Sequence, residues 1–166
     1  ERELNDVFLL PFEMAVKLAN AGSVMPAYHD IDGEPASSSV HLLTEVLRER
    51  WGFDGIIVSD YEAVSLLYRH HGVARDEAEA TALALKAGMD IELPGFACFR
   101  SGIEKALARG LIEPGQVDAA VRRVLAEKSR LGLFEHPYAD EGAVVLNTAE
   151  NRKVAAEAAE KSIVLL

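Results

Sequence analysis

The stretch that most constrains the fold is the run from Gly55 to Tyr61, Gly-Ile-Ile-Val-Ser-Asp-Tyr. Its three consecutive β-branched apolar residues show no polar alternation, which predicts a strand buried on both faces of a parallel sheet. The run then changes abruptly to a small polar residue, a carboxylate and an aromatic ring. In parallel α/β sheets, binding and catalytic groups collect at the carboxyl ends of the strands. Asp60 is therefore the first candidate for a catalytic side chain.

Strand and helix patterns alternate around this run. Short apolar segments at residues 23–28, 55–61 and 89–93 predict three strands. Helical spacing of apolar residues predicts helices at 1–21 (with a break near Pro11), 39–51, 62–69, 75–87, 99–109 and 114–131. The last helix is predicted to face inward with Val117, Val121, Val124 and Leu125. The turn-forming residues of 29–38 predict a loop. This alternation is the pattern of repeated βα units. Three such units cannot close an eight-stranded barrel, so we predict an α/β fold that is a partial (β/α)8 TIM-type barrel.

The predicted domain organisation has three parts. Residues 1–132 carry the barrel units, and residues 133–151 lack clear periodicity, which is typical of an interdomain linker. Residues 152–166 return to a helix followed by a strand-like run, which suggests the start of a second α/β domain. The chain begins inside a helical pattern without a methionine, and we expect it to be a fragment of a larger protein.

Composition limits the partners. The 166-residue chain has a formal net charge of -10, which disfavours binding to nucleic acid or to an anionic membrane. No run approaches the roughly 20 apolar residues of a membrane span. The single cysteine excludes an internal disulfide, and the adjacent pair His70-His71 has no third ligand at suitable spacing. We therefore predict no metal site and no cofactor; the sequence indicates neither a cell compartment nor an oligomeric state.

Several segments in order resemble glycoside hydrolase family 3. The most diagnostic block runs from Leu43-Thr44-Glu45-Val46-Leu47-Arg48 through Trp51-Gly52-Phe53-Asp54-Gly55 to Val58-Ser59-Asp60. The other similar segments are Pro11-Phe12-Glu13, Gly22-Ser23-Val24-Met25-Pro26-Ala27-Tyr28, Ile31-Asp32-Gly33-Glu34-Pro35, Ala87-Gly88-Met89-Asp90-Ile91-Glu92-Leu93-Pro94, Val121-Arg122-Arg123-Val124-Leu125 and Ser162-Ile163-Val164-Leu165-Leu166. Together they cover almost the whole chain, and the last resembles the entry into the family's α/β sandwich domain.

The resemblance implies a retaining β-glycosidase, of the exo-acting β-glucosidase or β-xylosidase type. In such enzymes one carboxylate attacks the anomeric carbon and a second, roughly 5–5.5 Å away, acts first as acid and then as base. The family's nucleophile corresponds to Asp60. Its sugar-binding Lys-His pair would lie before residue 1, and its acid/base glutamate beyond residue 166. The implied substrate is an oligosaccharide or a small β-glycoside, and the isolated chain is expected to be inactive.

Three further residues are candidates for substrate binding. Met25 and Tyr28 lie at the end of the neighbouring predicted strand, where the family lines its sugar subsite. Tyr61 stands where many members carry tryptophan, so an aromatic face for a sugar ring is retained with an added hydroxyl. Glu92, at another strand end, would either reach the rim of the same pocket or be a salt-bridged or capping carboxylate.

Two other functions remain open from the residues alone. A receiver-type signalling domain also has a phosphate-accepting Asp at a strand end, but it needs an acidic pair after its first strand and a lysine after a later one. Here Tyr28-His29-Asp30 is a poor acidic pair, and the strand at 89–93 is followed by no lysine. A non-catalytic carbohydrate-binding relic is the third possibility, which the intact Ser59-Asp60 disfavours.

Overall fold

The computed structural model describes residues 2–95 and 97–164. The chain divides into two compact units, residues 1–131 and residues 132–166. The first unit contains the three strands of a parallel sheet, and the second contains a connecting segment and one long helix.

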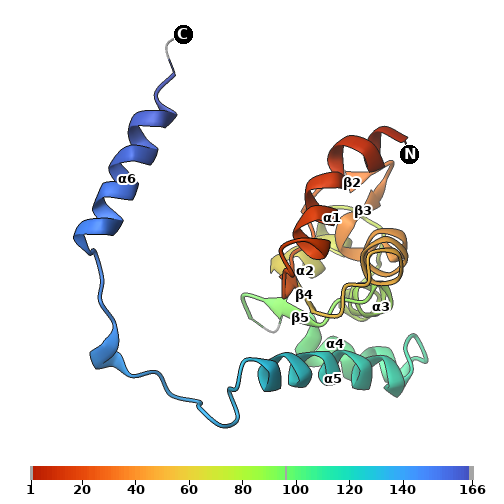
Figure 1. Ribbon diagram of the computed structural model, residues 1–166. Helices are drawn as coiled ribbons and strands as arrows, with labels where there is room; N and C mark the ends of the chain where they lie inside the picture. The colour runs from red at the N-terminus through yellow and green to blue at the C-terminus, as the bar shows by residue number, and fades with distance from the viewer. Residues whose placement is uncertain (1, 96, 165–166) are drawn as a thin grey trace. The chain divides into compact units, whose positions relative to one another are not determined.

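The sheet of the first unit has the strand order β1-β4-β5, and Figure 1 labels the neighbouring strands β4 and β5. Its strands are β1 (Ser23–Val24), β4 (Ile56–Tyr61) and β5 (Ile91–Leu93). Both pairings are parallel, with Ser23 opposite Ile56 and Val58 opposite Ile91. The three predicted strands therefore exist and lie side by side with β4 in the centre. The prediction of an α/β fold with parallel strands is confirmed, although β1 and β5 are shorter than the apolar patterns suggested.

Helices precede and follow each strand in the order predicted (Figure 1). They are η1 (Leu4–Phe8), α1 (Leu10–Lys17), the short η2 (Ala36–Ser38), η3 (His41–Arg50), α2 (Ala63–Arg69), α3 (Glu77–Ala87), α4 (Phe99–Ala108) and α5 (Pro114–Arg130). The predicted break near Pro11 is real, because η1 and α1 are separate and Pro11 lies in the first turn of α1, where its missing N–H costs nothing. The left-handed backbone of Gly88 (φ 102°) ends α3.

The segment predicted as a loop before η3 is partly ordered as a hairpin. Its two strands, β2 (Asp30–Ile31) and β3 (Glu34–Pro35), pair antiparallel. The two residues between them both have positive φ, 53° at Asp32 and 85° at Gly33. That combination matches the twist of a tight two-residue hairpin turn. The loop prediction was wrong here because the same residues that mark a loop also make this turn.

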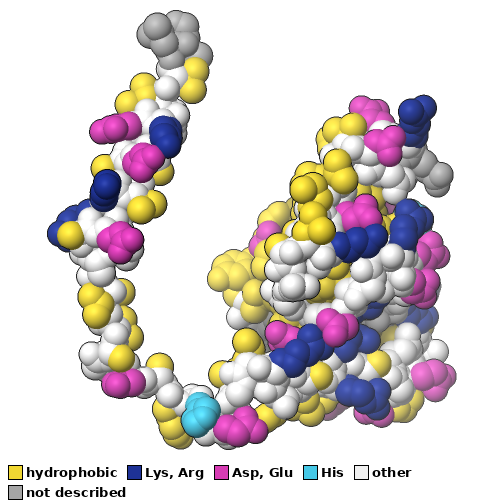
Figure 2. Space-filling view, in the orientation of Figure 1, with side chains coloured by type: hydrophobic (Ala, Val, Ile, Leu, Met, Phe, Trp, Pro, Cys, Tyr) yellow, Lys and Arg dark blue, Asp and Glu magenta, His cyan; other side chains and the backbone are white. Residues whose placement is uncertain are grey.

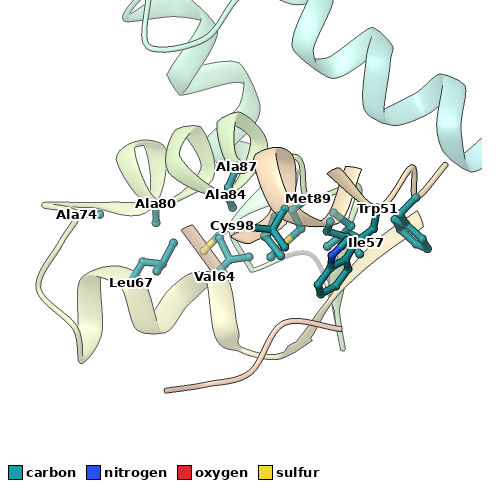
Figure 3. Packing of buried hydrophobic residues seen from close by; sticks show 14 of the residues in the cluster. Trp51, Ile57, Val64, Leu67, Ala74, Ala80, Ala84, Ala87, Met89 and Cys98 are labelled. Carbon is teal, nitrogen blue, oxygen red and sulfur yellow. The ribbon is translucent and has the colours of Figure 1, made fainter. Parts of the chain in front are cut away.

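The main core lies between the sheet and the helices η3, α2 and α3 (Figure 3). The largest fully buried side chains of this core are Val46, Ile57, Val64, Leu67 and Met89. Along β4 the burial alternates: Ile57 and Ser59 are buried, whereas their neighbours on the opposite face are only half-buried. The prediction that this strand is buried on both faces was wrong, because the packed helices bury one face only among the described residues.

A second apolar cluster joins α3, α4 and α5. Within it Ala120 of α5 is buried, but Val121 and Leu125, predicted to face inward, are 49% and 48% exposed. These two side chains border an open apolar groove of about 280 Å³ beside Ile91 and Phe99. Hydrophobic side chains are also exposed along α1, where Phe12 is 57% exposed (Figure 2). The described part of this unit therefore leaves substantial apolar surface open to solvent.

The second unit contains a short turn of helix, η4 (Glu141–Ala143), and the helix α6 (Ala149–Ser162). Thr148 begins α6, because its side chain accepts a hydrogen bond from the N–H of Asn151 at 3.1 Å. A strand was predicted after this helix; Ile163 and Val164 are not in a strand, and residues 165–166 lie outside the described residues. Among the helices of the described chain, none is long and apolar enough to cross a membrane.

Candidate active site at the carboxyl end of β4

Asp60 is the last residue but one of β4, the central strand of the sheet. It lies on the half-buried face of the strand, together with Ile56 and Val58. Its Oδ1 accepts a hydrogen bond from the backbone N–H of Tyr61 at 2.6 Å. The strand therefore holds the carboxylate at a fixed place on the edge of the sheet, while one side of it remains accessible.

Tyr28 is brought next to this site by the pairing of β1 with β4. Because the two strands are parallel neighbours, the residues after β1 lie at the same edge as the end of β4. The Tyr28 hydroxyl donates a hydrogen bond to the carbonyl oxygen of Tyr61 at 2.7 Å. The tyrosines are 43% and 59% exposed, so both offer part of their rings to solvent.

The pKa of the Tyr28 phenol is raised above its ordinary value, first by desolvation and then by hydrogen bonding to, and the negative charge of, Asp60. Because the shift is upward, the Tyr28 hydroxyl keeps its proton at neutral pH. Its single proton is donated to the Tyr61 carbonyl, so the phenol oxygen can accept a hydrogen bond from a ligand beside Asp60.

Met25 follows β1 directly and shares the same edge of the sheet. Its side chain is 49% exposed and does not belong to the apolar core. The structure therefore places Met25 at the same edge of the sheet as Asp60.

The ends of β4 and β5 are tied together by two hydrogen bonds around Asp60. The buried Ser59 Oγ accepts from the N–H of Leu93 at 2.9 Å. The N–H of Glu62 donates to the carbonyl of the same Leu93 at 3.1 Å. The residues immediately before and after the Asp60-Tyr61 pair are therefore fixed to the neighbouring strand, which makes this edge rigid.

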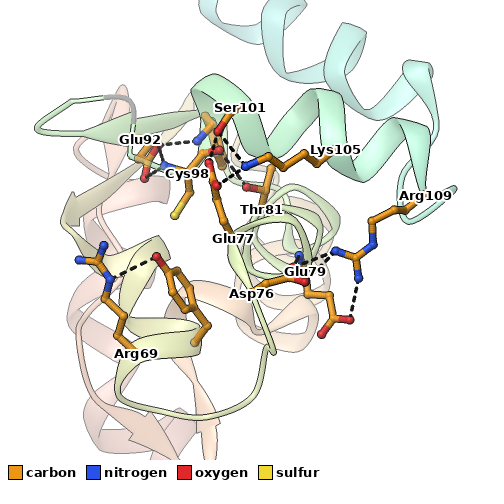
Figure 4. Close-up of polar contacts among 12 residues, drawn as sticks. Arg69, Asp76, Glu77, Glu79, Thr81, Glu92, Cys98, Ser101, Lys105 and Arg109 are labelled. Atoms are coloured by element: carbon orange, nitrogen blue, oxygen red, sulfur yellow. Dashed lines mark hydrogen bonds and ion pairs between the residues drawn. The ribbon is translucent and has the colours of Figure 1, made fainter.

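Glu92 is a helix cap and does not face the site. Its carboxylate accepts hydrogen bonds from the N–H groups of Cys98 (2.9 and 3.0 Å) and Phe99 (2.7 Å), at the start of α4 (Figure 4). A carboxylate is stabilised there by the unpaired N–H groups and the dipole of the helix. Of the two alternatives for this residue, the structure supports capping.

Sequence reasoning missed a buried ionic network at the opposite ends of these strands. The Asp90 side chain is fully buried and accepts hydrogen bonds from Arg48 Nη2 (2.7 Å), Arg123 Nε (2.6 Å) and the N–H of Ile57 (2.8 Å). It thereby connects η3, β4 and α5. The available signal was an aspartate enclosed by apolar residues in a predicted buried strand, because a buried charge needs partners.

In residues 2–95 and 97–164, His, Cys, Asp and Glu side chains form no group of three that could hold a metal ion. The rings of His70 and His71 contact each other edge to face after α2. Cys98 is buried, and burial raises the pKa of its thiol to about 12, so it is no nucleophile at neutral pH.

The fold and site define a class of protein. They show an α/β chain whose parallel strands present a carboxylate and two tyrosines at their carboxyl edge, where enzymes with parallel strands place their active-site groups. Residues 1–126 match the family model described as "Glycosyl hydrolase family 3 N terminal domain". The chain belongs to this family, as the sequence resemblance predicted.

Known relatives agree with this assignment. The chain is 40% identical over its whole length to a β-xylosidase of Formosa agariphila and 38% identical to a periplasmic β-glucosidase of Salmonella typhimurium. The crystal structure of a β-glucosidase from Listeria innocua in complex with glucose matches 99% of the chain with a TM-score of 0.90 and 36% identity. The chain spans only about a quarter of each relative: 24%, 22% and 23%, respectively.

Proposed function

We propose that this chain is part of a retaining β-glycosidase in which Asp60 is the nucleophile. The observation that carries the proposal is the placement of Asp60 in a chain that belongs to glycosyl hydrolase family 3. Its carboxylate lies at the carboxyl end of the central parallel strand and is half-buried. One of its oxygens accepts a hydrogen bond from the backbone N–H of Tyr61. Such a group is held still while it faces a ligand, which is the arrangement a positioned nucleophile requires.

The reaction proceeds by double displacement. One oxygen of Asp60 attacks the anomeric carbon, the bond from that carbon to the leaving-group oxygen breaks, and an acid residue protonates the departing oxygen. The same residue then removes a proton from water, which attacks the anomeric carbon and releases the sugar from Asp60. This chain supplies the nucleophile, and the acid/base residue lies in another part of the protein.

Tyr28, Met25 and Tyr61 form the wall of the sugar site in this proposal. Tyr28 contributes a neutral hydroxyl beside the nucleophile, while the rings of both tyrosines offer apolar faces to the C–H surface of a sugar. Met25 adds a flexible apolar contact at the same edge.

The surrounding architecture is proposed to be an incomplete (β/α)8 barrel. The half-exposed face of β4 that carries Asp60 would then be the inner face of the barrel, and its other face carries the helices. We assign residues 1–132 to the barrel, 133–151 to an interdomain linker and 152–166 to the start of a second α/β sandwich domain. The small share of each relative that the chain covers supports an incomplete barrel.

The substrate class follows from the relatives. Proteins named β-xylosidase and β-glucosidase match the chain about equally well, and similar structures were solved with glucose, with laminaribiose and with a xylobiose aziridine probe. We propose a terminal β-linked glucose or xylose, in an oligosaccharide or a small glycoside, as the group transferred.

Covalent trapping tests the proposal. The longer protein that contains this chain is incubated with a 2-deoxy-2-fluoro β-glucoside, and separately with the xylose analogue, and the label is located by peptide mass spectrometry. We expect the label on Asp60 and loss of turnover in Asp60→Ala, while the control Asp54→Ala, whose side chain is 81% exposed, stays active. Turnover by Asp60→Ala would exclude Asp60 as nucleophile. Robust hydrolysis by the 166-residue chain alone would contradict a divided active site.

A further inference from the structure

The residue that follows the Asp60-Tyr61 pair has an unusual backbone conformation. Glu62 is left-handed, with φ 63° and ψ 2°. Glycine adopts this conformation easily, whereas a residue with a Cβ is disfavoured, and glutamate lacks the short polar side chain that helps asparagine and aspartate. Strained residues of this kind persist only where the surrounding structure holds them, and they cluster at functional sites.

The contacts of Glu62 show what holds it. Its N–H donates to the carbonyl of Leu93 at 3.1 Å, and its carbonyl accepts from the N–H of Leu66 at 2.9 Å, which begins α2. The buried Ser65 Oγ lies within hydrogen-bond distance of both the Glu62 carbonyl (2.9 Å) and its carboxylate (3.0 Å). Arg69 stands 3.7 Å from the same carboxylate. Hydrogen bonds to β5 and to α2 thus hold the strained turn in place.

A single residue, Tyr61, separates the left-handed turn at Glu62 from the proposed nucleophile, Asp60. The carbonyl of Tyr61 accepts from the Tyr28 hydroxyl at 2.7 Å, so the peptide group between Tyr61 and Glu62 is held at its oxygen from the β1 side and at its N–H from β5. At the other end of Tyr61, the N–H donates to Asp60 Oδ1 at 2.6 Å. The orientation of the carboxylate therefore depends on a backbone segment that Glu62 ends.

We propose that Glu62 is a positioning residue for Asp60, acting through the left-handed turn and the backbone of Tyr61. This inference rests on the proposed function. A relaxed turn with negative φ would rotate the peptide between Tyr61 and Glu62, break its bonds to Tyr28 and Leu93, and release Asp60 Oδ1 from its backbone donor. The carboxylate would remain on the strand but lose its fixed direction of attack.

Substitutions at Glu62 separate the turn from the side chain. In the longer protein that contains this chain, Glu62→Gly keeps the turn and removes the carboxylate, while Glu62→Val disfavours the turn through its branched Cβ. With an activated aryl β-glycoside, we expect the glycine variant to keep kcat within about threefold and the valine variant to lose about tenfold or more, with KM little changed. Asn20→Val is the matched control, because Asn20 also has a positive φ (52°) but precedes β1, at the edge of the sheet away from Asp60.

Either of two results would overturn the inference. An equal loss of kcat in the glycine and valine variants would show that the carboxylate acts, and undiminished kcat in the valine variant would show that the turn does not matter. If the valine variant fails to fold, Glu62→Ala takes its place, since it keeps a Cβ and should lie below the glycine variant in kcat.

Thermal unfolding of the same variants of the longer protein gives a readout that does not depend on activity. Because only glycine is unstrained in this turn, Glu62→Gly should unfold at a higher temperature than Glu62→Ala. The reverse order would refute the left-handed turn. The proposed function fails if the native longer protein hydrolyses no β-glycoside, or if Asp60→Ala still catalyses hydrolysis. In that case the unfolding temperatures of Glu62→Gly and Glu62→Ala still test the left-handed turn independently.

Discussion

Substitution of Asp90 is expected to be among the most damaging changes in the first unit. Its side chain is fully buried and carries three hydrogen bonds, two of them to the guanidinium groups of Arg48 and Arg123. The side chains of these two arginines are themselves only 13% and 27% exposed. Asp90→Ala would leave both cations partly buried without their shared anion, and would leave the N–H of Ile57 without an acceptor.

The expected cost follows from this geometry. Removing one partner of a buried ion pair destabilises a protein by about 3–5 kcal/mol, because the remaining charge is not compensated. Since folded domains are stable by only about 5–15 kcal/mol, a loss of this size takes a large share of the total. Asp90→Asn keeps the shape and one acceptor oxygen, so we expect it to cost less than the alanine variant.

Urea unfolding followed by tryptophan fluorescence measures the effect. Trp51 is the single tryptophan, lies in the core at 9% exposure, and so reports on the first unit. The matched control is Asp54→Ala, which breaks a surface ion pair with Arg130 and should change stability by less than about 1 kcal/mol. A loss below about 1 kcal/mol for Asp90→Ala, or one equal to the control, would refute the assignment of this network as a main support of the fold.

Three further predictions concern other parts of the first unit. Gly102→Ala should destabilise by about 1–3 kcal/mol in the same assay, because its Cβ would overlap a side chain of α3, whereas Gly115→Ala, with free space around it, should not. Asp76 and Glu79 bond to Arg109 and Arg75 (Figure 4 shows Asp76, Glu79 and Arg109), and their pKa values are lowered, by hydrogen bonds first. The ionised carboxylates therefore stabilise the fold at neutral pH, and this stabilisation is lost as pH falls below about 4 through their lowered pKa values. The urea concentration at the midpoint of unfolding should decrease in that pH range, and it should decrease less in Asp76→Asn. Native Cys98 should resist iodoacetamide at pH 8 and react only after unfolding, because burial raises the pKa of its thiol to about 12; fast native labelling would contradict this.

Much of the α/β framework could be predicted from local patterns. The runs around Ile57 and Ile91 and the helical spacing between them gave three strands and their helices in the correct order, because burial against one core enforces those periods. The prediction for Val121 and Leu125 was wrong, since an apolar stripe shows that a helix face favours burial, not that a partner is present in this chain.

The candidate site was predictable only in part. Asp60 and Tyr28 could be named from strand ends and from the family resemblance, but the hydrogen bond from Tyr28 to the Tyr61 carbonyl depends on which strands become neighbours. The strained backbone of Glu62 left no trace in the sequence, because glutamate is not a residue type that favours positive φ. Tertiary contacts impose that conformation, and they become visible only in three dimensions.

Under the proposed function, the separation between the two ends of β4 bears on how the preference for one sugar or another could diverge. The ionic network around Asp90 binds β4 through the N–H of Ile57, near the start of the strand. Met25 and Tyr61 lie at the other end of the sheet, and about half of each side chain is exposed to solvent. Random substitution at Met25 and Tyr61 should therefore leave the fold nearly as stable as before. A lineage could sample new substrates at one end of the strand while purifying selection acts on the other, and a combinatorial library at these two codons should contain a high fraction of folded members.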